Sequence, residues 1–250
     1  NPVVFIGNSQ SVVLDVDHSA CKDRGIPIVR RFSGGQAVYI DKNYIVVNVF
    51  GPRALFPESL TKLRQDFCEA IIRALDQFGI PVNFYEPDNI VVFSPGIRTL
   101  GNSGQVIKGK AVGLQGSIRY ELTDKSLRDM LAVLKTNGRS LQGFYSQSRN
   151  ALASLKDFTN VKKADIKKAI LKELLSHYGC ESFEKNTPLP FEIGRITKIR
   201  ESLKERVEDR ENYAPRGVCY FYLNSQCIVP EIAAILPRNK PSTHLDSTIT

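Results

Sequence analysis

The period of the hydrophobic pattern changes after residue 57, and this change constrains the fold more than any other feature. Between residues 58 and 78 the apolar positions are Leu60, Leu63, Phe67, Ile71, Leu75 and Phe78. Their spacing predicts an amphipathic helix whose apolar stripe packs on a core rather than binding a ligand. Gly79 follows directly, as is typical of a helix C-terminus.

Short runs rich in β-branched and aromatic residues lie on both sides of this helix and predict strands. The predicted strands cover residues 3–7, 25–31, 37–40, 44–50, 82–85, 90–93 and 111–121. Asp41, Lys42 and Asn43 supply turn chemistry between two of these runs, so we expect a β-hairpin over residues 37–50. The polar stretch over residues 94–110 is expected to be a loop.

Two further helices are expected. One is short and amphipathic, around residues 127–134, and the other follows Asp165, which suits the N-cap position. Gly179 ends the second helix. Residues 11–14 suit either a helix or a turn, and residues 136–158 are expected to form looser surface structure.

Strands and helices are mixed, with hairpins instead of regular βαβ units. This pattern predicts an α+β fold with a mixed, largely antiparallel sheet and helices packed on it. We expect a main domain over residues 1–182 and a C-terminal extension or small accessory lobe over residues 183–250. Within the latter, the pattern predicts a linker at 186–190, a charged helix at 196–211 and a hairpin at 218–229.

Basic residues exceed acidic ones, and the net charge of +8 favours anionic partners such as nucleotides, phosphates or acidic protein domains. Nucleic acid is not expected, because the densest basic stretch, residues 198–206, alternates with glutamates. That option depends on net charge alone, and a salt titration tests it. No apolar run approaches the ~20 residues that cross a bilayer, so we expect a cytoplasmic protein without a membrane partner.

The cysteines and histidines give no expectation of a metal site. The five cysteines lack C-x-x-C spacing, and there are only three histidines. An odd number of thiols suggests a reducing compartment. Each cysteine is either reactive or a buried filler of the core.

The stretch RRFSGGQAVYID, residues 30–41, contains a glycine pair just before a predicted strand. Gly34 and Gly35 allow a close backbone approach, and successive N–H groups in such a turn form an anion site. Arg31 can add a guanidinium for a phosphate or carboxylate, whereas Arg30 should point to the opposite face. The alternative is a plain hairpin turn with surface arginines.

A second glycine-bearing stretch, residues 94–105, carries Arg98 between two predicted strands. It is either a ligand-binding loop or a flexible hairpin loop. Beyond it, Gly113 and Gly116 interrupt a strand pattern, which marks a bulge or a close backbone approach.

The order of these pieces resembles the lipoate–protein ligase A and octanoyltransferase family of the biotin/lipoate ligase superfamily. The similarity covers residues 2–179 and begins with a strand that ends in GNSQ, residues 7–10. The family's R-R-x-S-G-G-G-x-V-x-H-D motif corresponds to residues 30–41. An Asn-Asp-Ile-like strand start, a K-x-x-G loop and an H-G-[ST]-[IL] strand correspond to residues 88–90, 98–103 and 115–118.

This resemblance implies a biotin/lipoate ligase-like catalytic domain over residues 1–182 and a two-step reaction. Lipoate or octanoate would react with ATP to give an acyl-adenylate and pyrophosphate, with Mg²⁺ accompanying the ATP. A lysine of an acceptor domain would then take the acyl group. The implied acceptors are lipoyl domains of 2-oxoacid dehydrogenase complexes or the H protein of glycine cleavage.

The resemblance also assigns site residues. Arg98 stands at the position of the family's catalytic lysine and is expected to converge with Arg31 on one pocket. Asn89 would orient the acyl-adenylate. The full set of expected ATP- and substrate-binding residues is Arg31, Ser33, Gly34, Gly35, Gln36, Ala37, Val38, Tyr39, Asn89, Gly101, Gln115 and Gly116.

Four motif positions differ from the family pattern. Gln36 replaces a glycine, Ile40 and Gln115 replace histidines, and Arg98 replaces the lysine. No cysteine lies near residues 91–92, where octanoyltransferase relatives carry a nucleophile, so a thioester mechanism is not expected. The differences leave an alternative open: a homologue without turnover that binds or regulates lipoyl domains or nucleotide.

Overall fold

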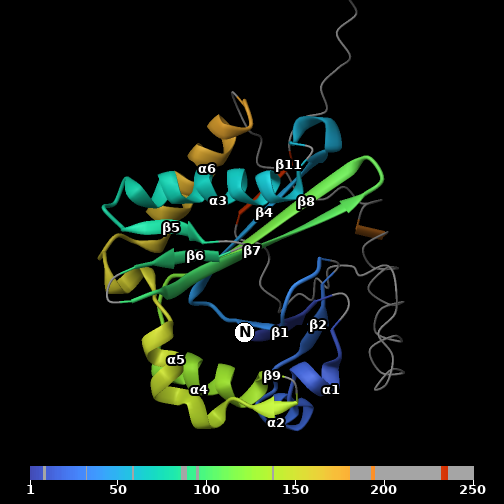
Figure 1. Ribbon diagram of the computed structural model, residues 1–250, viewed down its shortest axis with the longest axis vertical. Helices are drawn as coiled ribbons and strands as arrows, with labels where there is room; N and C mark the ends of the chain where they lie inside the picture. Colours follow the sequence, from blue (N-terminus) through green and yellow to red (C-terminus); the bar gives the residue numbers. More distant parts are fainter. Residues whose placement is uncertain are drawn as a thin grey trace, which may run out of the picture.

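The computed structural model describes residues 1–7, 10–31, 33–57, 59–85, 89–93, 96–136, 138–180, 193–194 and 232–235. They form an α+β fold in which a large sheet with its helices faces a smaller sheet with helices of its own (Figure 1). The expected fold class is therefore confirmed.

The large sheet has six strands in the order β11-β4-β8-β7-β6-β5. Its strands are β4 (Tyr44–Pro52), β5 (Val82–Tyr85), β6 (Asn89–Val92), β7 (Arg98–Lys108), β8 (Ala111–Arg119) and β11 (Ile232–Ile235). All neighbours are antiparallel except β11, which pairs with β4 in parallel. The sheet is thus mixed and largely antiparallel, as the sequence predicts.

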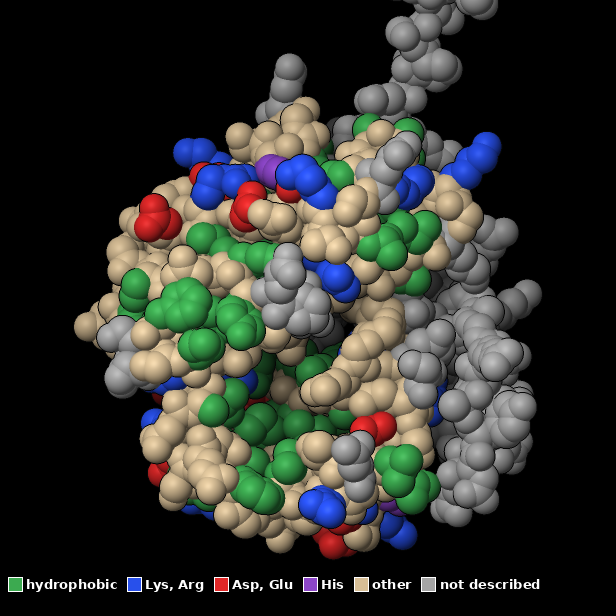
Figure 2. All heavy atoms as spheres, viewed as in Figure 1, with side chains coloured by type: hydrophobic (Ala, Val, Ile, Leu, Met, Phe, Trp, Pro, Cys, Tyr) green, Lys and Arg blue, Asp and Glu red, His purple; other side chains and the backbone are tan. Residues whose placement is uncertain are grey.

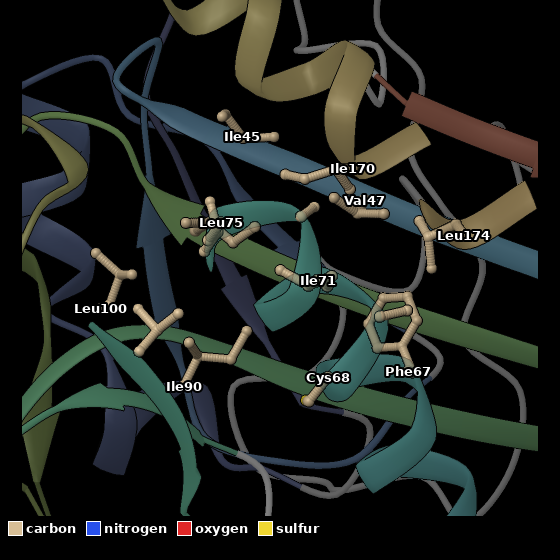
Figure 3. Close-up of a cluster of buried hydrophobic side chains, with 14 of the residues drawn as sticks. Ile45, Val47, Phe67, Cys68, Ile71, Leu75, Ile90, Leu100, Ile170 and Leu174 are labelled. Atoms are coloured by element: carbon tan, nitrogen blue, oxygen red, sulfur yellow. The ribbon is translucent and has the colours of Figure 1, made fainter. Parts of the chain in front are cut away.

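Helices α3 (Leu60–Asp76) and α6 (Lys163–His177) cover one face of this sheet and form the main core with it (Figure 3). Phe67, Ile71 and Leu75 of the predicted apolar stripe are fully buried. Burying side chains of this size stabilises the fold by about 1.5–3 kcal/mol each. The stripe from Leu63 to Leu75 is therefore core, as expected, whereas Leu60 at the start of the helix is 48% exposed. Ser59 caps the helix by accepting a hydrogen bond from the Lys62 amide.

The smaller sheet has the order β2-β1-β3, with β1 (Val3–Ile6), β2 (Ile28–Arg30) and β3 (Val38–Ile40). One of its faces packs on an apolar cluster that includes Val4, Ile6, Cys21 and Val133. The helices on this side are α1 (Val12–Asp15), α2 (His18–Asp23) and α4 (Asp124–Val133). The sequence allowed a helix or a turn at residues 11–14, and the structure forms the helix α1 from Val12.

The remaining elements connect these layers. They are the short strands β9 (Lys135–Thr136) and β10 (Arg139–Ser140), the helix α5 (Tyr145–Ala151), and the 3₁₀ turns η1 (Arg53–Leu55), η2 (Gln142–Phe144) and η3 (Leu155–Asp157). Residues 136–158 thus hold more regular structure than the sequence pattern predicts.

The expected hairpin over residues 37–50 is wrong. β3 pairs with β1 in the smaller sheet, whereas β4 pairs with β8 in the large sheet. The turn between them carries the chain from one sheet to the other. The buried Asp41 carboxylate holds this turn, because it accepts hydrogen bonds from the Asn43 amide and from the Ser126 hydroxyl on α4.

The expected loop over residues 94–110 is also wrong, because β7 occupies most of it. β7 pairs along its length with β8 and at its start with β6. Ladder hydrogen bonds on both sides outweigh the weak strand propensity of Gly, Asn and Ser. Gly101 is needed here, because a Cβ at this position would overlap the Ser117 carbonyl oxygen on β8.

Asp165 is not an N-cap, since α6 already begins at Lys163 and Asp165 lies in its first turn. The linker, charged helix and hairpin predicted beyond residue 185 lie outside the described residues. Within that region, β11 adds a strand to the large sheet. Among the helices that the structure describes, none has both the length and the apolar character for a membrane span.

Candidate functional site

The glycine-rich loop, defined here as residues 33–37, is held by the guanidinium of Arg31. Its Nη2 donates to the carbonyl oxygens of Gly34 at 2.8 Å and Gln36 at 2.7 Å, and its Nη1 donates to Phe5 on β1 at 3.2 Å. Gly35 has φ of +94°, a conformation that favours glycine. Arg31 therefore fixes the shape of the loop from its carbonyl side.

Arg30 braces the neighbouring segment. Its Nη1 donates to the carbonyl oxygens of Gly7 at 3.0 Å and Gln10 at 2.7 Å. Gly7 and Gly35 meet so closely that a Cβ on Gly7 would overlap the Gly35 carbonyl oxygen. Both arginines are thus used to position backbone.

The backbone N–H groups of the glycine-rich loop differ from its carbonyl groups in their hydrogen bonding. The carbonyls of Gly34 and Gln36 accept from Arg31, but the N–H groups of Gly34 and Gly35 have no acceptor among the described residues. Unpaired successive N–H groups beside a fixed cation suit an anion. The loop therefore has the chemistry of a phosphate or carboxylate site.

The loop reaches the large sheet at its hydroxyl residue. Ser33 is buried, and its Oγ donates to Gln115 Oε1 of β8 at 2.6 Å. A Cβ on Gly104 of β7 would lie 3.8 Å from the same Oγ. Two motifs that are far apart in the sequence are thus joined at one point of the sheet.

Gln115 belongs to a polar row on the sheet face opposite α3. Gly116 next to it faces α3, since a Cβ there would lie 3.0 Å from the Phe67 ring, so Gln115 and Ser117 face away from that helix. Strand pairing places further polar residues beside these two on the same face. The polar row comprises Asn48, Asn89, Asn102, Gln115 and Ser117.

Within the row, the Ser117 hydroxyl donates to Asn102 Oδ1 at 2.7 Å. Asn89 lies directly opposite Asn102 in the pairing of β6 with β7. The expected residues Ser33, Asn89 and Gln115 are therefore on one side of the large sheet. The chain contributes them from the loop after β2 and from two strands.

An apolar wall adjoins the polar row. Val46, directly opposite Ser117, packs against the same buried cluster as Phe5 and Val38 of the smaller sheet, and all three are partly buried. Figure 2 shows the surface hollowed between the large-sheet layer and the layer of the smaller sheet and α4, with hydrophobic side chains on its walls. This arrangement offers a polar floor and an apolar side to one ligand.

Arg98 is not brought to this site, so the expected convergence with Arg31 is not found. Its guanidinium contacts Asp157 at 3.4 Å and lies 5.3 Å from the centre of the Phe158 ring. Phe158 packs against the α3-side core, and so does Val92, which is the strand partner of Arg98. Arg98 therefore lies on the helix-covered face of the sheet.

A register shift explains this orientation. Ile90 pairs with Gly101 and Val91 pairs with Thr99, so Leu100 is an extra residue in β7. An unbroken strand would place Arg98 on the same face as Asn102 and Gly104. The bulge reverses the facing and turns Arg98 away from the polar row.

Other expected site residues also divide between the two faces of their strands. Val38 belongs to the apolar wall, whereas Tyr39 lies in the cluster beneath the smaller sheet, where burial strongly raises the pKa of its hydroxyl. Gly116 faces α3, and Gly101 serves close strand packing. Tyr39, Gly101 and Gly116 therefore do not face the polar row.

Three residues of the row, Asn48, Asn102 and Ser117, are not among the site residues expected from the sequence. Asn48 is the one polar side chain in the apolar run YIVVNVF, residues 44–50, and that exception was the available signal. Asn102 lay in a stretch predicted to be a loop. Arg119, also buried, was missed as well: its Nε donates to the Tyr44 hydroxyl at 3.1 Å and its Nη1 to the Ala153 carbonyl at 2.8 Å.

Among the residues that the structure describes, no group of three or more His, Cys, Asp or Glu side chains could hold a metal ion. Cys68 lies on the buried face of α3, and its Sγ lies 3.3 Å from Ser103 Oγ. Burial raises the pKa of the Cys21 thiol to about 11. Both thiols are buried, unlike the accessible thiol of a typical nucleophile.

The profile of the lipoyl protein ligase A/B catalytic domain matches residues 1–175. Lipoate-protein ligase LplJ of Bacillus subtilis is 25% identical over 162 residues, which cover 64% of this chain and 46% of that protein. Lipoate-protein ligase A subunit 1 of Thermoplasma acidophilum is 23% identical over 219 residues, or 83% of this chain and 77% of the relative. This chain thus spans less than half the length of LplJ.

Solved structures share the fold. The bipartite lipoate protein ligase of Thermoplasma acidophilum, studied with its E2 lipoyl domain, superposes with a TM-score of 0.68 at 20% identity, covering 85% of this chain and 78% of that chain. A lipoate-protein ligase A with bound ATP gives a TM-score of 0.60 at 20% identity, covering 85% and 80%.

Proposed function

Because this chain belongs to the lipoyl protein ligase A/B catalytic domain family, we propose that it is an acyltransferase that uses ATP to attach lipoate or octanoate to a lipoyl domain. The acyl carboxylate would attack the α-phosphorus of ATP and release pyrophosphate. The lysine amine of the acceptor would then attack the carbonyl carbon of the acyl-adenylate and release AMP. Family membership and the layout of the cleft support this proposal.

The hydrogen bond between Ser33 and Gln115 is the observation that carries the proposal. It joins an anion-binding loop to a sheet face that is polar at Gln115 and apolar at Val46. An acyl-adenylate needs this sequence of environments, since its phosphate is charged and its chain is apolar. A site for a small polar metabolite would not require the apolar wall.

The apolar wall would hold the acyl chain. Each methylene removed from water contributes about 0.8 kcal/mol, so an eight-carbon chain gains several kcal/mol from such a wall. Phe5, Val38 and Val46 are the side chains positioned to supply it. Because no polar side chain lies among them, the wall would select length and shape rather than chemistry.

The glycine-rich loop would hold phosphate. The groups present suit a phosphate of ATP. The amides of Gly34 and Gly35 have no acceptor among the described residues, and the charge of Arg31 is fixed beside them. Bound ATP would supply the leaving group for acyl activation, and Mg²⁺ would enter with its phosphates. Arg31 acts through the loop, by fixing where the amides point.

Lipoyl domains are the proposed acceptors. The net charge of +8 favours acidic partner domains. The bipartite Thermoplasma ligase, which shares this fold, was studied with its E2 lipoyl domain. The H protein of glycine cleavage is a second proposed acceptor of the same kind, and a cytoplasmic location is proposed with both.

A direct assay tests the function. The purified chain is incubated with an apo lipoyl domain, ATP, Mg²⁺ and either lipoate or octanoate, and the acceptor is weighed by mass spectrometry. We expect the acceptor to gain the acyl mass only when ATP is present. An acceptor of unchanged mass with both acids, while the chain remains folded by circular dichroism, would contradict the proposal.

One observation favours a second candidate. Arg98, at the position of the family's catalytic lysine, faces the helices rather than the polar row. The chain could then bind nucleotide, acyl-adenylate or lipoyl domains and regulate a neighbour without turnover. Calorimetry would show ligand binding with no pyrophosphate release, and measurable release rules this candidate out.

A further inference from the structure

Asn48 carries a buried side-chain amide whose oxygen has no partner in the described part of the fold. Its side chain lies in the middle of β4 and is 1% exposed. Its Oδ1 has no hydrogen-bond partner among the residues that the structure describes. Nearly all buried polar atoms in proteins are paired, so an unpaired amide at the centre of a strand asks for an explanation.

The position of Asn48 indicates what it could contact. It lies directly opposite Gln115, on the sheet face that the glycine-rich loop meets through Ser33. Its neighbour on the same face of β4 is Val46, which belongs to the apolar wall. Asn48 therefore marks the boundary between the apolar wall and the polar floor.

A fatty acid such as octanoate is apolar along its chain and becomes polar at its carboxyl group. If the chain lies along the wall at Val46, the carboxyl group reaches the row at Asn48. The amide of Asn48 offers both a donor and an acceptor there. It is uncharged, so it suits the substrate carboxylate as well as the less charged carbonyl of the activated acyl group.

We propose that Asn48 is a substrate-positioning residue that hydrogen-bonds the carboxyl oxygen of the acyl substrate at the boundary between the apolar wall and the polar row. This role depends on the proposed function and adds to it. It fixes how deep the chain enters, so that the carboxyl group stops beside the glycine-rich loop. The unpaired amide oxygen would then lower the stability of the chain without ligand and serve to bind the substrate.

The test combines binding and stability in two variants, Asn48→Leu and Asn48→Ala. Octanoate and 1-octanol are titrated by calorimetry, and thermal unfolding is measured without ligand. We expect octanoate to bind Asn48→Leu about tenfold to a hundredfold more weakly, because a hydrogen bond to a charged group is lost. Octanol, which has no carboxyl group, should lose at most about twofold.

Stability separates this role from a structural one. Asn48→Leu replaces a buried amide whose oxygen is unpaired by an apolar group of similar shape, so its melting temperature without ligand should equal or exceed that of the parent chain. Asn48→Ala avoids overpacking and should show the same loss for octanoate. Asn83→Leu, on the exposed edge strand β5, is the matched control and should bind both ligands normally.

Each other outcome overturns the inference. Equal losses for octanoate and octanol would mean that Asn48 shapes the wall without reading the carboxyl group. A lower melting temperature for both variants with unchanged octanoate affinity would mean that the amide serves the fold through a bound water. If the parent chain binds octanol but neither octanoate nor lipoate, the proposed function itself fails.

Discussion

Arg31 shows how a single charged side chain can act at a site through the backbone. Its guanidinium donates hydrogen bonds to three carbonyl oxygens, two of them in the glycine-rich loop. A planar fork can hold several carbonyls at fixed angles, which an ammonium cannot do. The geometry of the loop amides therefore depends on this residue being arginine.

The substitution Arg31→Lys should lower activity while keeping the fold. We expect pyrophosphate release with octanoate and ATP to fall at least about tenfold, because the loop loses two paired donors and its amides are no longer fixed. The control is Arg24→Lys, since Arg24 at the C-terminal end of α2 makes an ion pair with Asp129 of α4. An Arg31→Lys variant with the parental rate would show that the conformation of the glycine-rich loop does not depend on Arg31.

Arg98 provides the opposite prediction. Because its partners Asp157 and Phe158 lie on the helix side, Arg98→Lys should leave the rate of acyl transfer within about twofold of the parent. The measurement is the initial rate of mass gain by the lipoyl domain. A large change in either direction would show that Arg98 reaches the substrate during turnover.

Single residues of the site were only partly predictable from the sequence. The glycine pair and Gln115 could be singled out because turn chemistry and motif order are local features. The facing of Arg98 could not, because one extra residue in β7 reverses the alternation on which such reasoning depends. Asn48 was overlooked because only strand pairing reveals that it adjoins Gln115.

At the scale of elements, Gly7, directly after β1, lies so close to the glycine-rich loop that it has no room for a side chain. Gly7→Ala would force a methyl group into the Gly35 carbonyl. We expect the free energy of unfolding to fall by about 2 kcal/mol or more, since backbone must move to relieve the overlap. Urea denaturation followed by circular dichroism measures this.

Gly34→Ala is the control in the same loop. A Cβ at Gly34 would meet nothing within 4 Å, and its φ is not among the positive values. Its free energy of unfolding should stay within about 0.5 kcal/mol of the parent. Equal destabilisation by both substitutions would mean that the loop is sensitive to any side chain.

The C-terminal end of α6 should make stability depend on pH. Burial, and then the nearby charge of Arg73, lowers the pKa of His177 below its ordinary value of 6.5. The unfolded chain therefore binds a proton that the folded chain refuses, so the free energy of unfolding should fall as the pH drops from about 7.5 to about 5.5.

His177→Gln should flatten this dependence, which thermal unfolding at several pH values would show. His18→Gln, at an exposed histidine of α2, is the matched control and should keep the parental slope. If both variants retain the slope, another group is responsible for it.

The elements themselves were predictable wherever their pattern is local. The stripe of α3 follows from helical spacing alone, and β1, β4 and β8 follow from β-branched runs. β7 was missed because its stability comes from partners on both sides rather than from its own residues. The pairing of β3 with β1 was missed because a tight turn ordinarily predicts a hairpin.

At the scale of the whole molecule, net charge should affect the binding of the acceptor more than it affects the adenylation step. The net charge of +8 would attract an acidic acceptor, such as the proposed lipoyl domain would be, over distances at which salt screens the attraction. The apparent KM for the lipoyl domain should therefore rise severalfold as sodium chloride increases from about 50 to about 500 mM. Pyrophosphate release without acceptor serves as the control and should change much less.

The division into residues 1–182 and 183–250 stays a prediction, and β11 is the described part of the second region that bears on it. β11 extends the large sheet beside β4. A strand that joins an existing sheet draws its stability from that sheet, so no local pattern in the sequence could reveal its partner.

The turn at residues 41–43 ties the two sheets together at one corner, with its carboxylate anchored to α4. A tether this short permits rotation between two bodies but hardly any sliding. If the hollow opens by rotation about this turn, the edge far from the turn should separate most and the edge beside it least. A long substrate would then enter sideways through the far edge rather than being threaded from one end.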